Sequence, residues 1–156
     1  MCFCSVQIFL LLIVYVYSFY CNQKSLILIF KMYCFMFFRS FFVQGDFLEV
    51  EKFLEKGVFD HIVSWLTVLH FNNRMQLFRA SYNLLKPGGH FYVADLCRTE
   101  STNGLTVKER QELREEVYCH DLGTSTQLIA EMESVGFRLK ETIDKTDEWK
   151  RYVIDT

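Results

Sequence analysis

A strand, a helix and a second strand follow one another in the middle of the chain, and this order constrains the fold most. Residues 59–64 mix apolar and β-branched side chains, which predicts a buried strand. Asn72 or Asn73 can cap a helix whose apolar residues recur at near-helical spacing. The run Lys86-Pro87-Gly88-Gly89 ends this helix, because proline cannot continue it and glycine permits a positive φ. Residues 90–95 then form the second strand.

Two strands joined through one helix should lie side by side and run parallel. The sequence therefore predicts an α/β sheet. Residues 41–43 form a short apolar strand before it, and two amphipathic helices follow it, over residues 106–118 and 124–135. The alternating residues 138–143 and 149–154 predict an antiparallel hairpin that closes the sheet.

Residues 1–44 differ in composition from the remainder of the 156-residue chain. They hold 9 of the 16 Phe and 4 of the 6 Cys, and they contain no Gly, Pro, Asp or Glu. Their charges are Lys24, Lys31 and Arg39, so they carry +3 and the remaining residues carry −5, for a total of −2. We therefore divide the chain into a hydrophobic segment, residues 1–40, and a domain, residues 41–156.

Three interpretations of the hydrophobic segment stay open. Its dominant residue types are those that T-rich codons encode, and such a composition is typical of translated noncoding sequence. It is also apolar enough for a membrane or targeting segment over residues 8–38. Lys31 and Arg39 lie inside the second apolar stretch, residues 26–43, and each would cost a few kcal/mol near the bilayer centre. The third interpretation is a genuine globular extension. We expect residues 1–40 to be helical or poorly ordered, with membrane contact only if they are genuine protein.

Cysteine spacing and net charge exclude two classes of site. Cys2 and Cys4 are too close together for a metal site, and the other four cysteines lack paired partners. The net charge of −2 gives no support for binding to a nucleic-acid backbone. We therefore expect no metal and no nucleic-acid partner. Isolated cysteines are the pattern of a reduced, cytoplasmic compartment, with membrane association through residues 8–38 as the alternative.

Three sequence motifs resemble those of the class I S-adenosylmethionine-dependent methyltransferases and follow one another along the chain as they do in that family. They are Phe59-Asp60-His61-Ile62-Val63-Ser64, the turn Leu85-Lys86-Pro87-Gly88-Gly89 before that family's fifth strand, and Val43-Gln44-Gly45-Asp46-Phe47, which looks like the end of its third strand. The resemblance covers residues 41–156 and implies a Rossmann-like methyltransferase sheet. The sheet should be incomplete in its N-terminal half, because the family's Gly-x-Gly-x-Gly loop and ribose-binding acid are absent from residues 1–44.

The resemblance implies transfer of a methyl group from S-adenosylmethionine to a small-molecule acceptor. Residues 118–122, 135–137 and 144–149 are loosely similar to sarcosine/dimethylglycine and phosphoethanolamine methyltransferases, which favours an amine acceptor. The alternative is a non-catalytic remnant or binding module, tethered to a membrane if residues 1–40 are genuine.

The resemblance also implies where the cofactor binds. An acid at the end of the third strand would face the adenine, and residues after the fourth strand would line the transferred methyl. Ligands of open α/β sheets bind at the carboxyl ends of the strands, where Asp46, Ser64 and Asp95 lie. We expect Asp46 to face this crevice beside Ser64, with a simple Gly-Asp turn as the alternative. The cofactor-binding candidates are Asp46, Phe47, Ser64, Trp65 and Leu66.

Three further side chains are candidates for contact with the acceptor. His70 could orient or deprotonate it, or could only pack or cap the following helix. Tyr118 and Trp149 could hold a cationic amine by cation–π contact, or could be ordinary half-buried aromatics. Arg110 and Arg114, four residues apart among glutamates, indicate a solvated helix face.

Overall fold

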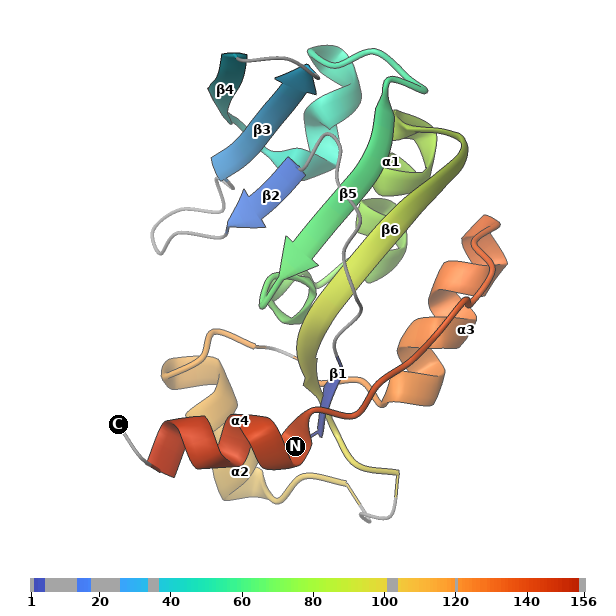
Figure 1. Ribbon diagram of the computed structural model, residues 1–156. Coiled ribbons are helices and arrows are strands. Elements are labelled where there is room, and N and C mark those ends of the chain that lie inside the picture. The colour runs from blue at the N-terminus through green and yellow to red at the C-terminus, as the bar shows by residue number, and fades with distance from the viewer. Residues whose placement is uncertain are drawn as a thin grey trace.

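The structure is a computed structural model, shown in Figure 1. It describes residues 2–4, 14–17, 26–33, 37–100, 104–119 and 121–154, and the side chains of those between residues 45 and 151. The strands are β1 (Cys2–Cys4), β2 (Val14–Tyr17), β3 (Leu26–Tyr33), β4 (Phe37–Gln44), β5 (Phe59–Trp65) and β6 (Leu85–Cys97). The helices are η1 (Phe47–Lys52), η2 (Val68–His70), α1 (Arg74–Leu84), α2 (Val107–Glu115), α3 (Ser125–Val135) and α4 (Thr146–Ile154). The described strands form one sheet in the order β1-β6-β5-β2-β3-β4.

The predicted strand–helix–strand unit is confirmed. β5 and β6 pair in parallel, with Ile62 opposite Phe91 and Trp65 opposite Ala94. The helix between them, α1, is capped by Asn73, whose side chain accepts a hydrogen bond from the Gln76 backbone N–H at 3.1 Å. Figure 1 shows α1 alongside these two strands.

The Lys-Pro-Gly-Gly run ends α1 as predicted, but it is already part of β6 rather than a separate turn. Strand β6 begins at Leu85, directly after α1, and Gly88 adopts φ +80°. Gly89 is closely surrounded, because a Cβ atom there would lie 3.0 Å from the Asp60 carbonyl oxygen, the Lys86 carbonyl oxygen and a Leu85 methyl group. The glycine thus permits close approach of two backbone segments.

We expect Gly89→Ala to lower the free energy of unfolding by about 1–3 kcal/mol, the usual range for overpacking. Two of the three neighbouring atoms are backbone oxygens, which move only if β5 and β6 shift. Urea denaturation followed by circular dichroism measures the change. An unaltered midpoint and slope would contradict the tight packing.

One hydrophobic core joins β5 and β6 to the helices on one face of the sheet. Phe78 and Leu77 of α1 pack with Ile62 of β5, and η1 adds Phe47 and Val50; all five side chains are buried. The N-terminal end of α3 contributes Leu128 to the same core. Burial of these apolar side chains is the main source of stability for this part of the chain.

Arg74 ties α1 to α3 with a largely buried ion pair. Its Nε and Nη2 atoms each donate to the Glu131 carboxylate at 3.0 Å, and Nη1 donates to the Asp121 backbone carbonyl at 2.9 Å. Hydrogen bonds to Glu131 raise the pKa of Arg74 above its ordinary value, and partial burial of the guanidinium opposes this shift. Helix α3 agrees with the predicted range of residues 124–135 to within one residue: Thr124 is its N-cap, and Gly136, at φ 120°, follows its last residue.

The described parts of residues 1–40 are strands, so the expectation that this segment is helical or poorly ordered is wrong there. β2 pairs in parallel with β5, with Val16 opposite Ser64, while β3 pairs antiparallel with β2 and with β4. Aromatic and β-branched residues fill these strands, and such residues favour strands over helices. Among the described residues, no helix is both long and apolar enough to cross a bilayer. The rest of residues 1–40 lies outside the description.

The predicted closing hairpin is also wrong. Residues 149–154 belong to α4, and residues 138–143 are not in a strand. The Asp144 side chain accepts a hydrogen bond from the Thr146 backbone N–H at 2.8 Å, and Asp147 and Glu148 occupy the first turn. A capping acid followed by acids in the first turn is a helix-start signal, and it outweighs a short alternating pattern. β1 instead pairs antiparallel with β6.

Candidate active site

The carboxyl ends of four strands meet at one edge of the sheet. β2, β5 and β6 are mutually parallel, and β4 shares their direction because it is antiparallel to β3, which is antiparallel to β2. Asp46 follows β4, and the loop containing Leu66 and Thr67 follows β5. The candidate cofactor residues therefore lie at the edge where open α/β sheets bind ligands.

Asp46 lies at this edge but not beside Ser64. β3 and β2 lie between the strands that carry the two residues, so the expectation that these strands are neighbours is wrong. With a strand spacing of about 4.8 Å, the two strand ends are about 14 Å apart. Asp46 caps η1, and its Oδ1 atom accepts from the Leu48 backbone N–H at 2.9 Å. The Leu48 carbonyl accepts from the Gln76 side chain at 3.3 Å, which places η1 near the first turn of α1.

The other cofactor candidates differ in how far they reach solvent. The Phe47 ring is fully buried in the core, so only its backbone is left to face a ligand. Ser64 is buried, and its hydroxyl has no hydrogen-bond partner in the described part of the chain. Trp65 is 46% exposed at the end of β5. Leu66 has φ 47° and packs against a second small cluster formed by Leu69, Leu113, Cys119 and Leu122.

His70 ends η2 and lies against the segment after α2. Its Nδ1 atom is 3.5 Å from the Tyr118 carbonyl oxygen. Partial burial lowers the pKa of His70, and the backbone carbonyls of Tyr118 and Val117 oppose this shift. The Tyr118 side chain is 54% exposed, and Trp149 is half-buried in α4. The structure thus brings the Tyr118 backbone carbonyl to the His70 imidazole.

Asp95 is the most strongly perturbed acid among the described residues. It is 2% exposed and accepts hydrogen bonds from the backbone N–H groups of Thr67, Leu69 and Leu96, at 3.1, 3.2 and 2.8 Å. Burial raises the pKa of Asp95 to about 6, although the backbone N–H groups, foremost that of Leu96, lower it. The sequence places this acid at a strand end but does not show which groups it binds.

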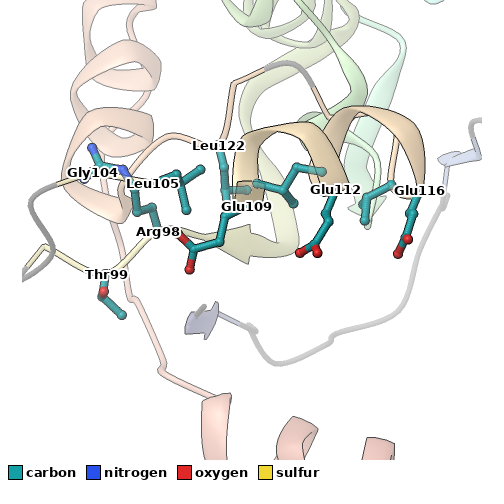
Figure 2. Close-up of a pocket in the computed structure, with 10 residues that line it drawn as sticks. Arg98, Thr99, Gly104, Leu105, Glu109, Glu112, Glu116 and Leu122 are labelled. Atoms are coloured by element: carbon teal, nitrogen blue, oxygen red, sulfur yellow. The ribbon is translucent and has the colours of Figure 1, made fainter. Parts of the chain in front are cut away.

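A pocket of about 290 Å³ opens between α2 and the segment that follows β6. Figure 2 shows Glu109, Glu112 and Glu116 projecting from α2 on the same side, with Arg98 near Glu109. Leu113, Val117 and Leu122 form its apolar wall. Sequence reasoning treated α2 as a solvated face and missed this pocket. The spacing of the glutamates, which places them on one helix face, was the available signal.

Comparison with known proteins identifies the fold. Residues 32–93 match the methyltransferase domain family. Phosphoethanolamine N-methyltransferase 1 of Triticum aestivum is 31% identical over 97 residues, which are 62% of this chain and 18% of that protein. Its Arabidopsis thaliana namesake is 32% identical over 92 residues, covering 58% of this chain and 18% of that protein. The resemblance to the class I methyltransferases is confirmed.

Solved methyltransferase structures have the same fold. Haemonchus contortus phosphoethanolamine N-methyltransferase 2, in complex with phosphomonomethylethanolamine and S-adenosylhomocysteine, matches with a TM-score of 0.63 and 23% identity over 74% of this chain and 26% of that one. A Bacillus halodurans candidate methyltransferase matches with a TM-score of 0.55 and 24% identity over 64% of this chain and 42% of that one. The chain spans less than a fifth of the length of the curated relatives above.

Proposed function

We propose that residues 41–156 form part of a methyltransferase that transfers a methyl group from S-adenosylmethionine to a small-molecule amine. The observation that carries this proposal is the 31% identity to a phosphoethanolamine N-methyltransferase over 97 residues. The arrangement of strand ends supports it, because candidate residues gather at the ligand-binding edge of the sheet. A phosphorylated ethanolamine is the first acceptor to test.

The residues present fit the adenine end of S-adenosylmethionine. The Asp46 carboxylate can accept from an exocyclic amine, and the Phe47 backbone N–H can donate to a ring nitrogen. The buried Phe47 ring cannot cover the purine. The exposed Trp65 lies at the end of β5, about 14 Å from the end of β4, so its ring would face the other end of the ligand. A ligand that reaches both strand ends has to be elongated, as a nucleoside joined to an amino acid is. When bound, S-adenosylmethionine supplies the methyl group from a sulfonium centre.

His70 is the residue we assign to proton removal from the acceptor. A carbonyl oxygen only accepts, so the contact with Tyr118 favours a proton on Nδ1 and leaves the lone pair on Nε2. The lowered pKa of His70 keeps the imidazole neutral at neutral pH. On transfer of a methyl group to its nitrogen, the amine would have to lose one proton, which the His70 Nε2 atom could take up.

Asp46→Ala should weaken binding of S-adenosylhomocysteine by about 10- to 150-fold, since a hydrogen bond to a charged group contributes about 1.5–3 kcal/mol. A titration followed by NMR measures dissociation constants into the millimolar range. Asp60→Ala is the matched control, because Asp60 is an exposed acid paired with Lys86 at 2.9 Å. Equal affinity in both variants, with a lower melting temperature for Asp46→Ala, would make Asp46 a turn residue only.

A binding module without catalysis is the second candidate. β2 takes the position beside β5, yet the chain contains no glycine before Gly45, so no glycine-rich loop follows β2. The same titration separates the two candidates when it is combined with transfer of a labelled methyl group. Ligand binding without transfer to any amine would favour the binding module.

A further inference from the structure

The Asp95 carboxylate accepts hydrogen bonds from two backbone N–H groups of the segment after β5 and from one of its own strand, β6. Oδ2 accepts from the N–H groups of Thr67 and Leu69, and Oδ1 accepts from Leu96. An ionised carboxylate only accepts, so both oxygens suit a site lined by backbone donors. The two bonds from Oδ2 bridge 28 and 26 residues of sequence, and they therefore join β6 to a segment that is distant in the chain.

The loop held in this way is sharply bent. Leu66 has φ 47°, a left-handed conformation that is unfavourable for an L-residue. Its N–H donates to the Ala94 carbonyl at 2.8 Å, and the Thr67 hydroxyl donates to the Trp65 carbonyl at 2.8 Å. Such a conformation persists only where its surroundings fix it. Asp95 supplies two of the bonds that do so.

His70 depends on the same loop. The backbone N–H of His70 donates to the Thr67 carbonyl oxygen at 3.1 Å. The residue that carries the imidazole is therefore bonded directly to Thr67, whose own N–H binds Asp95. Leu69, whose N–H binds Asp95, is itself buried against Leu113, Cys119 and Leu122. The loop therefore links β6 to the segment whose Tyr118 carbonyl faces the imidazole.

We propose that Asp95 is a positioning residue that fixes the loop of residues 66–70 and thereby holds the His70 imidazole at the ligand-binding edge of the sheet. The use of His70 in proton removal rests on the proposed function, but the position of its ring does not. Removing the carboxylate frees Thr67 and Leu69, relaxes the bent loop and exposes the imidazole to water.

The pKa of His70, measured by NMR in the full chain without any ligand, tests this proposal. In Asp95→Asn, the amide oxygen can still accept a hydrogen bond, but an NH₂ group replaces the second oxygen. In Asp95→Ala, both acceptors are lost. We expect the pKa of His70 to rise toward its ordinary value, more in the alanine variant, because partial burial is what lowers it. Loss of a neighbouring negative charge alone would shift the pKa in the opposite direction. A rise therefore reports movement of the loop.

Amide hydrogen exchange locates the effect. Exchange at Thr67 and Leu69 should accelerate at least tenfold in Asp95→Asn, with Ile62 and Leu77 unchanged, and Asp60→Asn should alter neither loop amide. An unchanged pKa of His70, or equal acceleration of all four amides, would overturn the proposal. Asparagine is similar in size to aspartate, so this variant tests the loop even if Asp95→Ala does not fold. Neither measurement needs methyl transfer, so failure of the proposed function would leave both results standing.

Discussion

Phe78→Ala should lower the free energy of unfolding by about 3–5 kcal/mol, the cost of deleting a buried phenylalanine side chain. Phe78 has no exposed surface and meets Phe91 of β6 edge-to-face, with ring centroids 6.3 Å apart. It therefore joins α1 to the sheet at the centre of the core. Urea unfolding, followed by far-ultraviolet circular dichroism, measures the loss.

Phe53→Ala is the matched control for this prediction. Phe53 is 43% exposed after η1, so its removal should cost less than about 1 kcal/mol. If both variants lost the same stability, the contact between α1 and the sheet would not be the core of the domain. A loss in Phe78→Ala alone would confirm that the strand–helix–strand unit carries the stability.

The elements that local sequence signals specify were predicted well. Asn73 caps the start of α1 and the Lys-Pro-Gly-Gly run follows its end, because a side-chain cap and a positive φ are requirements of a few neighbouring residues. The parallel pairing of β5 and β6 follows from the helix between them, since a crossover of this length leaves little choice of topology.

The pairings that depend on distant residues could not be predicted. β2 and β3 lie between β4 and β5, although β4 immediately precedes β5 among the strands of the chain. Nothing in the local pattern reports such an insertion, so Asp46 was expected beside Ser64. In α4, a short alternating run was ambiguous between strand and helix, and the cap at Asp144 decided for the helix.

The candidate site was predictable in its location but not in its contacts. Strand direction alone places Asp46, Trp65 and Asp95 toward one edge of the sheet. The hydrogen bond from Thr67 to Asp95 joins residues 28 positions apart, and the bent backbone of Leu66 has no glycine to mark it. Long-range polar contacts of this kind become visible only once the sheet is assembled.

Asp95→Asn should also change how stability depends on pH, by about 2.4 kcal/mol between pH 4 and pH 7. Burial raises the pKa of Asp95 from its ordinary value of 3.8 to about 6, so the folded chain binds this proton more tightly than the unfolded chain does. The stabilisation from a raised pKa is fully present below 3.8 and is lost as the pH rises through about 6. A shift of about two pKa units corresponds to about 3 kcal/mol over the whole titration, of which about 2.4 kcal/mol is lost between pH 4 and pH 7.

The measurement compares wild type and Asp95→Asn by urea unfolding at several pH values between 4 and 7. Carboxylates such as Glu109 and Asp144, whose hydrogen bonds lower their pKa values, act with the opposite sign but are shared by both proteins, so their effect cancels in the difference. The difference in unfolding free energy, wild type minus variant, should fall by about 2.4 kcal/mol from pH 4 to pH 7. A constant difference would mean that the bonds from Thr67, Leu69 and Leu96 fully offset burial of the charge, and a rising difference would mean that they outweigh it.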